Sequence, residues 1–126
     1  MNYTIEKNDQ HSIIKPDLTK IDQRTANKLR DKVLHEVASS SKYVIVNIET
    51  VKECNADGTR ELIKLGLDLR NGGGMLIITN ADDQFTRLFE KADITFIPTD
   101  VEAMDFVFMD QLEKQFLNMN EGDIVE

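Results

Sequence analysis

The sequence feature that most constrains the fold is an apolar run, residues 43–49, that leads into a polar turn and then into a helical pattern. The run reads YVIVNIE, and nearly continuous apolar character over this length is typical of a central strand covered by helices. After the turn, Leu62, Leu65 and Leu69 recur at spacings of three and four residues, as on one face of an α-helix. The sequence therefore predicts a buried strand, a short loop, and a helix whose positive N-terminal end adjoins that loop.

The remaining chain alternates strand and helix patterns, which predicts an α/β domain with a mixed central sheet of four to five strands and about four helices. The expected strands are residues 2–7, 12–15, 43–49, 75–79 and 94–97. The expected helices are residues 22–38 with Asp22 as the cap, 57–70, 82–91, and a final helix that starts near Glu102. The side chains expected to face inward are Phe85, Leu88 and Phe89 in the third helix, and Val101, Met104, Val107, Phe108, Leu112 and Phe116 in the fourth.

Length and charge narrow the class of protein. The 126 residues fit one domain, which we expect to span residues 1–117, followed by a frayed acidic C-terminal tail at 118–126. A net charge of −8 opposes binding to nucleic acid or to anionic membranes. The apolar runs are too short to insert in a bilayer, and residues 1–7 lack the apolar segment of a signal peptide, so a cytoplasmic location is expected.

The chemistry-bearing residues give no sign of an enzyme, a cofactor or a metal site. Cys54 is the single cysteine and is expected to pack as a small apolar residue, while His11 and His35 are expected on the solvated surface. The glycines at 72–74 close a helix and open a strand, whereas a phosphate-binding loop does the reverse. Asp82 and Asp83 are better explained as helix-start residues than as the acidic pocket of a receiver domain.

The order of these elements resembles the STAS domain, the fold of bacterial anti-sigma factor antagonists. The resemblance covers residues 1–117 and rests on the run at 44–48, Gly58 at the start of the second helix, and the glycine turn before residues 75–80. The switch loop of the family reads Asp-Ser-Ser-Gly or Asp-Thr-Ser-Gly. The aligned residues here are Asn55, Ala56, Asp57 and Gly58, so a carboxylate occupies the place of the phosphorylated serine.

The resemblance implies a non-enzymatic regulatory module of bacterial signal transduction that binds a protein partner. In the family, that partner is an anti-sigma factor that is often also a serine kinase, and phosphorylation of the switch serine releases the complex. The residues expected to contact the partner are Asn55, Ala56, Asp57, Gly58, Thr59, Arg60, Glu61, Lys64 and Asp68.

Three alternatives stay open from the sequence. The chain could be a structural STAS scaffold in a signalling or transport assembly, or it could be an unrecognised enzyme or a STAS domain that binds a small molecule. Asp57 could also be only a helix-end carboxylate, stabilised by the helix dipole and by free backbone N–H groups. The oligomeric state, including a homodimer, is left undecided.

Overall fold

A five-stranded mixed sheet forms the centre of the molecule. The computed structural model describes residues 2–125, with side chains described as far as residue 118. The sheet has the order β1-β2-β4-β6-β7, in which β1 is antiparallel to β2 and every other neighbouring pair is parallel. The strands are β1 (Tyr3–Lys7), β2 (Ser12–Pro16), β4 (Tyr43–Asn47), β6 (Met75–Thr79) and β7 (Thr95–Ile97). The predicted fold class is confirmed.

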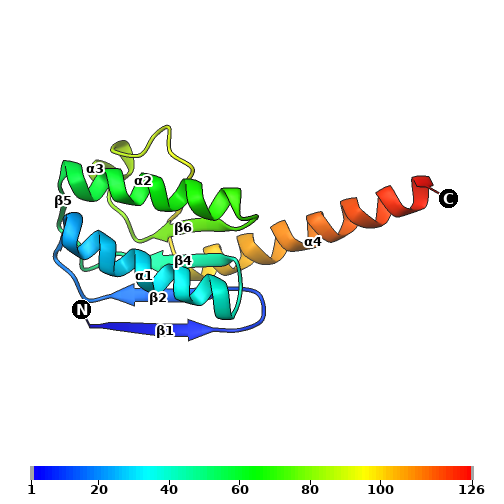
Figure 1. Ribbon diagram of the computed structural model, residues 1–126, viewed down its shortest axis with the longest axis horizontal. Coiled ribbons are helices and arrows are strands. Elements are labelled where there is room, and N and C mark those ends of the chain that lie inside the picture. The colour runs from blue at the N-terminus through cyan, green and yellow to red at the C-terminus, as the bar shows by residue number, and fades with distance from the viewer. Residues whose placement is uncertain (1, 126) are drawn as a thin grey trace.

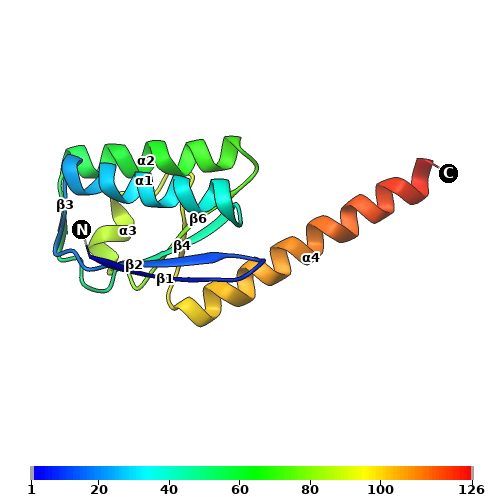
Figure 2. The same ribbon diagram turned by 60° about the horizontal axis from the view of Figure 1, so that its bottom comes forward.

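Helices cover both faces of the sheet (Figures 1 and 2). One face carries α1 (Gln23–Ser39), α2 (Ala56–Asn71) and the short α3 (Asp83–Arg87), and the other carries α4 (Asp100–Val125). A separate parallel pair joins β3 (Lys20–Ile21) to β5 (Glu53–Cys54). The sequence did not predict this pair, because strands of two residues are too short to show a periodic pattern.

The central strand β4 is buried along its whole length, as its apolar run predicted. Val44 and Val46 belong to the core beneath α1 and α2, whereas Tyr43 and Ile45 belong to the smaller core beneath α4. Successive side chains of a strand point to opposite faces, so a strand covered on both sides needs apolar residues at every position. β4 also has a parallel neighbour on each side, β2 and β6.

The helix after the loop packs as expected. Leu62, Leu65 and Leu69 of α2 are all at most 3% exposed and lie in the larger core. The glycine turn that follows is a helix stop, because Gly73 has a positive φ of 84° and a Cβ at Gly74 would collide with the backbone of Lys42. The interpretation of these glycines as backbone punctuation is confirmed.

The third helix is shorter than predicted. α3 ends at Arg87, and the N–H of Leu88 turns back to the carbonyl groups of Phe85 and Thr86. Phe85 and Phe89 are buried as expected, but Leu88 is 48% exposed, so its predicted inward position is wrong. Phe85 and Phe89 occupy the inner side of this segment, where they pack on each other and on Phe96 with ring centroids 5.0 to 6.3 Å apart, and Leu88 is left on the solvent side.

A polar network fixes the start of α4. The Asn47 amide donates a hydrogen bond to Asp100 over 2.9 Å, and the Thr79 hydroxyl donates to the same carboxylate. The Thr99 hydroxyl accepts the Glu102 N–H at 3.2 Å and so caps the new helix. Asn47 and Thr79 are buried at the ends of β4 and β6, so α4 is tied to two central strands.

The predicted inner stripe of the final helix is largely wrong. Val107 is buried and Met104 is half-buried, but the other four predicted residues are exposed. α4 instead packs through Ala103 and Val107 and then projects beyond the sheet (Figure 2).

The final helix also continues to Val125, where the sequence predicted a frayed tail. The division into a domain at 1–117 and a tail at 118–126 stays a prediction. None of the helices in the described chain has the length and apolarity needed to cross a membrane.

His11 is buried, contrary to the predicted solvated position, whereas His35 is exposed as expected. His11 directly precedes Ser12, which pairs with Val44 of the central strand. The pairing of Ser12 therefore places His11 inside the fold, although it lies in a turn. His11 is 5% exposed, and its Nδ1 has no hydrogen-bond partner among the described residues. Burial lowers the pKa of His11 below its usual 6.5.

We expect His11 to make the free energy of unfolding fall as the pH drops below about 6.5. The unfolded chain then binds a proton on His11 that the native chain excludes, which favours unfolding. His11→Gln should weaken this pH dependence relative to wild type in urea unfolding at about pH 5.5 and pH 7.5. His35→Gln is the matched control and should keep it. Equal pH dependence in wild type and His11→Gln would show that burial of His11 has no such effect.

Candidate functional site

The candidate switch loop lies at the edge of the molecule where the parallel strands end. After β4 the chain passes through β5 and enters α2, so the loop is held beside β3. The Asn55 N–H donates to the carbonyl of Ile21 over 3.0 Å, which extends the β3–β5 pairing by one bond. A loop bonded to a neighbouring segment in this way has a defined backbone position.

Asn55 is the residue that caps α2. Its side-chain oxygen accepts the Gly58 N–H at 2.8 Å, and Ala56 begins the helix. The sequence placed the helix start near Asp57, but the structure puts Asp57 in the first turn, one residue after Ala56. Because Asn55 already supplies the cap, the Asp57 carboxylate is not needed for that purpose.

Gly58 is buried where α2 meets β3. A Cβ at this position would lie 2.5 Å from the carbonyl oxygen of Ile21. Such a distance is shorter than any van der Waals contact, so a larger residue would push α2 and β3 apart. Gly58 is therefore a packing residue that brings the loop close to β3, and its own surface is not available to a partner.

Asp57 points to solvent at the start of α2. Its carboxylate pairs with the guanidinium of Arg60 at 2.9 Å, and the two side chains are 54% and 67% exposed. An ion pair this exposed contributes at most about 1 kcal/mol, because water and salt screen it. A binding partner could therefore separate Asp57 from Arg60 at little cost.

Thr59 and Cys54 contact each other behind the loop. The Thr59 hydroxyl donates to the carbonyl of Asn55 over 2.9 Å and lies 3.4 Å from the Cys54 sulfur. Burial raises the pKa of the Cys54 thiol, although the contact with Thr59 opposes this. The thiol is protonated at neutral pH, which fits the expected packing role and disfavours a nucleophile.

The other predicted contact residues follow the outer face of α2. Arg60, Lys64 and Asp68 are exposed, while Glu61 is half-buried. Asp68 pairs with Arg30 of α1, so its carboxylate is already engaged. Asn55 and Ala56 are exposed at the helix start. The structure thus gathers the predicted residues at one end and one side of α2, apart from the buried Gly58.

Sequence reasoning missed two apolar residues beside this face. Ile63 and Leu67 are 37% and 44% exposed, four residues apart on α2. Their positions are out of phase with Leu62, Leu65 and Leu69, and that phase is the sequence signal that could have identified them. Together with Lys64 and Arg60 they give α2 a mixed apolar and charged outer surface.

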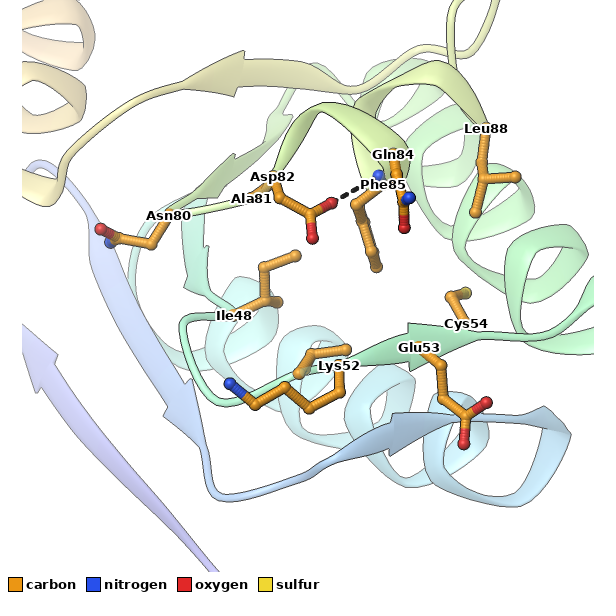
Figure 3. A pocket seen from close by; sticks show the side chains of 11 residues that line it. Ile48, Lys52, Glu53, Cys54, Asn80, Ala81, Asp82, Gln84, Phe85 and Leu88 are labelled. Atoms are coloured by element: carbon orange, nitrogen blue, oxygen red, sulfur yellow. Dashed lines mark hydrogen bonds between the residues drawn. The ribbon is translucent and has the colours of Figure 1, made fainter.

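A cleft adjoins the loop (Figure 3) and was not predicted. Its volume is about 250 Å³, and it opens between the segment after β4 and the start of α3. Asn80 on its rim has a left-handed φ of 58°, a conformation that asparagine tolerates better than most residues. Asp82 caps α3 by accepting the Phe85 N–H at 2.8 Å, as predicted. The described residues contain no group of three metal-binding side chains.

The Asn55 cap should contribute measurably to stability. Asn55→Ala removes the acceptor of the Gly58 N–H, so we expect the free energy of unfolding to fall by about 1 kcal/mol in urea titration. Asn55→Asp keeps an acceptor at the same place and should remain close to wild type. If Asn55→Ala were as stable as Asn55→Asp, the cap would not contribute to the free energy of unfolding.

Comparison with solved structures places this fold among known ones. The anti-sigma factor antagonist SpoIIAA in its unphosphorylated form matches with a TM-score of 0.66 and 17% identity, covering 84% of this chain and 97% of SpoIIAA. A serine-to-glutamate variant of RsbS from Moorella thermoacetica gives 0.70 and 17%, covering 90% and 99%. The murine anion transporter Slc26a9 gives 0.69 and 16%, covering 82% of this chain and 18% of the transporter.

At sequence identities of 16% to 17%, the similarity to these structures shows that the fold is shared and shows nothing further. A comparison with curated protein sequences finds no match. The model of the STAS domain family, however, matches residues 2–115, which is nearly the whole chain and includes the loop, α2 and the cleft. The chain belongs to the STAS domain family.

Proposed function

We propose that this STAS domain is a non-enzymatic regulatory module that binds a partner protein through the exposed side chains of residues 55–59 and the outer face of α2. The observation that carries the proposal is the exposed Asp57 carboxylate, which stands where the resemblance puts the switch serine and is not the helix cap. By analogy with the antagonists that share the fold, the partner is an anti-sigma factor or a serine kinase.

The charge of Asp57 gives the proposal its mechanism. A phosphorylated serine carries about 1.5 to 2 negative charges and three acceptor oxygens, whereas aspartate carries one charge and two oxygens. The loop therefore holds a permanent, weaker version of the phosphorylated charge. A partner that prefers the charged loop would bind without a kinase step, and a partner that needs a neutral hydroxyl would be excluded.

The stiffness of the loop supports a binding role. The Asn55 cap, the bond from Asn55 to Ile21 and the close approach at Gly58 fix the backbone that carries Asp57. Ordering a flexible loop costs free energy on binding, and a loop that is already ordered avoids most of that cost. A partner that contacts Asp57 would have to rearrange its exposed ion pair with Arg60.

The second candidate function is a structural scaffold in a transport assembly. The fold similarity to Slc26a9, a STAS-containing anion transporter of which this chain covers 18%, favours it. In that role the domain would use packing surfaces and the charge of Asp57 would be incidental. The two functions are separated by whether binding depends on residue 57.

We expect a serine kinase to leave the switch loop of the wild-type protein unphosphorylated. Ala56 and Asp57 have no hydroxyl, and the Thr59 hydroxyl is half-buried and bonded to Asn55. The test is incubation with the partner kinase and ATP, followed by mapping of phosphate by mass spectrometry. Asp57→Ser is the positive control, because it restores a hydroxyl at the exposed position. Phosphate on Thr59 of the wild type would indicate a displaced switch and contradict the fixed-charge proposal.

Asp57→Ser should change partner affinity more than stability. The lost helix-dipole interaction costs about 0.3 to 1 kcal/mol, and Asn55 still caps the helix. The affinity for the partner, identified by pull-down from the native cytoplasm and then purified, should change at least about tenfold, or 1.4 kcal/mol, in calorimetry.

Asp83→Ser is the matched control for this experiment. Asp83 is an exposed carboxylate in the first turn of α3, so its loss repeats the helix-end effect without touching the loop. We expect Asp83→Ser to bind the partner like the wild type. If Asp57→Ser bound the partner as tightly as the wild type but was markedly less stable, Asp57 would be only a helix-end residue. That result would favour the structural-scaffold function.

A further inference from the structure

The largest run of exposed apolar side chains lies on α4, on the opposite side of the sheet from the switch loop. We call it the outer stripe and define it by five residues that are 47% to 63% exposed: Val101, Phe108, Met109, Leu112 and Phe116. At about 100° per residue they lie on the side of α4 opposite Ala103 and Val107, which pack on the sheet. Phe106 and Leu117 are also exposed and lie on a flank of α4 between this stripe and the side that packs on the sheet. Apolar residues of α4 therefore extend well beyond the side that its own domain covers.

Residues 112–118 of α4 have little cover from the rest of the domain. The last described hydrogen bonds to the domain come from Gln111, which reaches the carbonyl of Gln10 at 3.0 Å, and from Lys114, which reaches the Tyr43 hydroxyl at 2.8 Å. Residues 112–118 are all exposed, and the helix projects away from the sheet (Figures 1 and 2). Most helices are stabilised by packing of an apolar face, so residues 112–118 lack this usual source of stability within the described part of the chain.

The charges on α4 indicate what covers the stripe. Residues 100–118 contain five carboxylates, Asp100, Glu102, Asp105, Asp110 and Glu113, and one cation, Lys114. Lys114 is already paired with Asp110, and Asp100 with Asn47 and Thr79. The other three carboxylates form no ion pair among the described residues, and they lie within or beside the stripe.

These carboxylates disfavour a second copy of the chain and favour a cationic partner. A second copy would bring an identical set of unpaired carboxylates to the same interface, and each chain has a net charge of −8. An anionic lipid surface would be repelled in the same way. A partner segment that presents both apolar side chains and Lys or Arg can cover the apolar stripe and also pair with these carboxylates.

We propose that the outer stripe of α4 is a docking site for a basic amphipathic helix of a partner protein. The apolar side chains of that helix pack on Phe108, Leu112 and Phe116, and its cations pair with Glu102, Asp105 and Glu113. This is the arrangement by which amphipathic helices are recognised through their apolar face, here with charges that fix orientation. Because α4 and α2 cover opposite faces of the sheet, this site is separate from the proposed partner surface at the switch loop.

The test measures the binding of synthetic helical probes to the full chain by fluorescence anisotropy. The main probe is a labelled peptide of about 18 residues, or five turns, with leucines on one helical face and lysines elsewhere. A scrambled peptide has the same composition without an apolar face, and a third peptide carries glutamate in place of lysine. We expect the main probe to bind at least about tenfold more tightly than either of the others.

Variants of the stripe locate the binding site. The double variant Leu112→Gln/Phe116→Gln should weaken binding of the main probe at least about tenfold, while circular dichroism and thermal unfolding show an intact fold. Leu34→Gln is the control, because Leu34 is an exposed leucine on α1, across the sheet from α4. Glu102→Gln/Glu113→Gln should weaken binding and reduce its dependence on salt.

Three results would overturn the proposal. The first is unchanged affinity of the double variant for the main probe. The second is equal binding of the scrambled peptide, which would show attraction by charge alone. The third is a dimer in sedimentation analysis that the double variant dissociates, because a second copy of the chain would then be the occupant of the stripe.

Discussion

The burial of β4 on both faces is the constraint on which the rest of the structure depends. Val44 and Val46 belong to one core and Tyr43 and Ile45 to the other, so α1 and α4 pack against the same strand from opposite faces, while α2 packs on α1 and β6. β4 also ends in Asn47, whose amide holds Asp100 at the start of α4. That bond and the one from the buried Thr79 on β6 fix the start of α4, and the packing of Ala103 and Val107 on the sheet leaves the outer stripe on the opposite side of the helix.

The position of the switch loop depends on contacts that are distant in sequence. Ile21, which precedes α1, accepts the Asn55 N–H and limits residue 58 to glycine. These two contacts connect the start of α1 to the start of α2 and leave Asp57 as the exposed charged group at the helix end. Asp57 takes no part in these contacts, and its exposed carboxylate pairs with Arg60.

The two surfaces proposed for binding differ in physical character. The face of α2 combines Arg60 and Lys64 with the exposed Ile63 and Leu67, beside the single carboxylate of Asp57. The outer stripe of α4 is apolar, and the carboxylates within or beside it, Glu102, Asp105 and Glu113, form no ion pair among the described residues. α2 and α4 lie on opposite faces of the sheet, so the two surfaces are separate (Figures 1 and 2).

The sequence by itself determined the elements whose signals are local. The continuous apolar run identified β4, the spacing of Leu62, Leu65 and Leu69 identified α2, and Asp22 and Asp82 were recognised as helix caps, which the structure confirms. These predictions succeed because periodicity and capping involve residues within a few positions of one another. The family resemblance rested on the same local patterns and their order, and the match over residues 2–115 confirms it.

Only the tertiary structure decided the features that depend on distant contacts. The burial of His11, the exposure of Leu88 and the outward turn of Phe108 and Phe116 all depend on where an element lies relative to the sheet. The features of the candidate site likewise fall into those that the sequence predicted and those that only the folded structure showed. The sequence could predict a polar loop at a helix start, but the role of Asn55 as the cap, the contact of Gly58 with Ile21 and the adjoining cleft required the assembled fold. An apolar pattern in the sequence indicates that one face of a helix or strand should be covered. Whether the same chain covers that face is determined by how the elements pack in three dimensions.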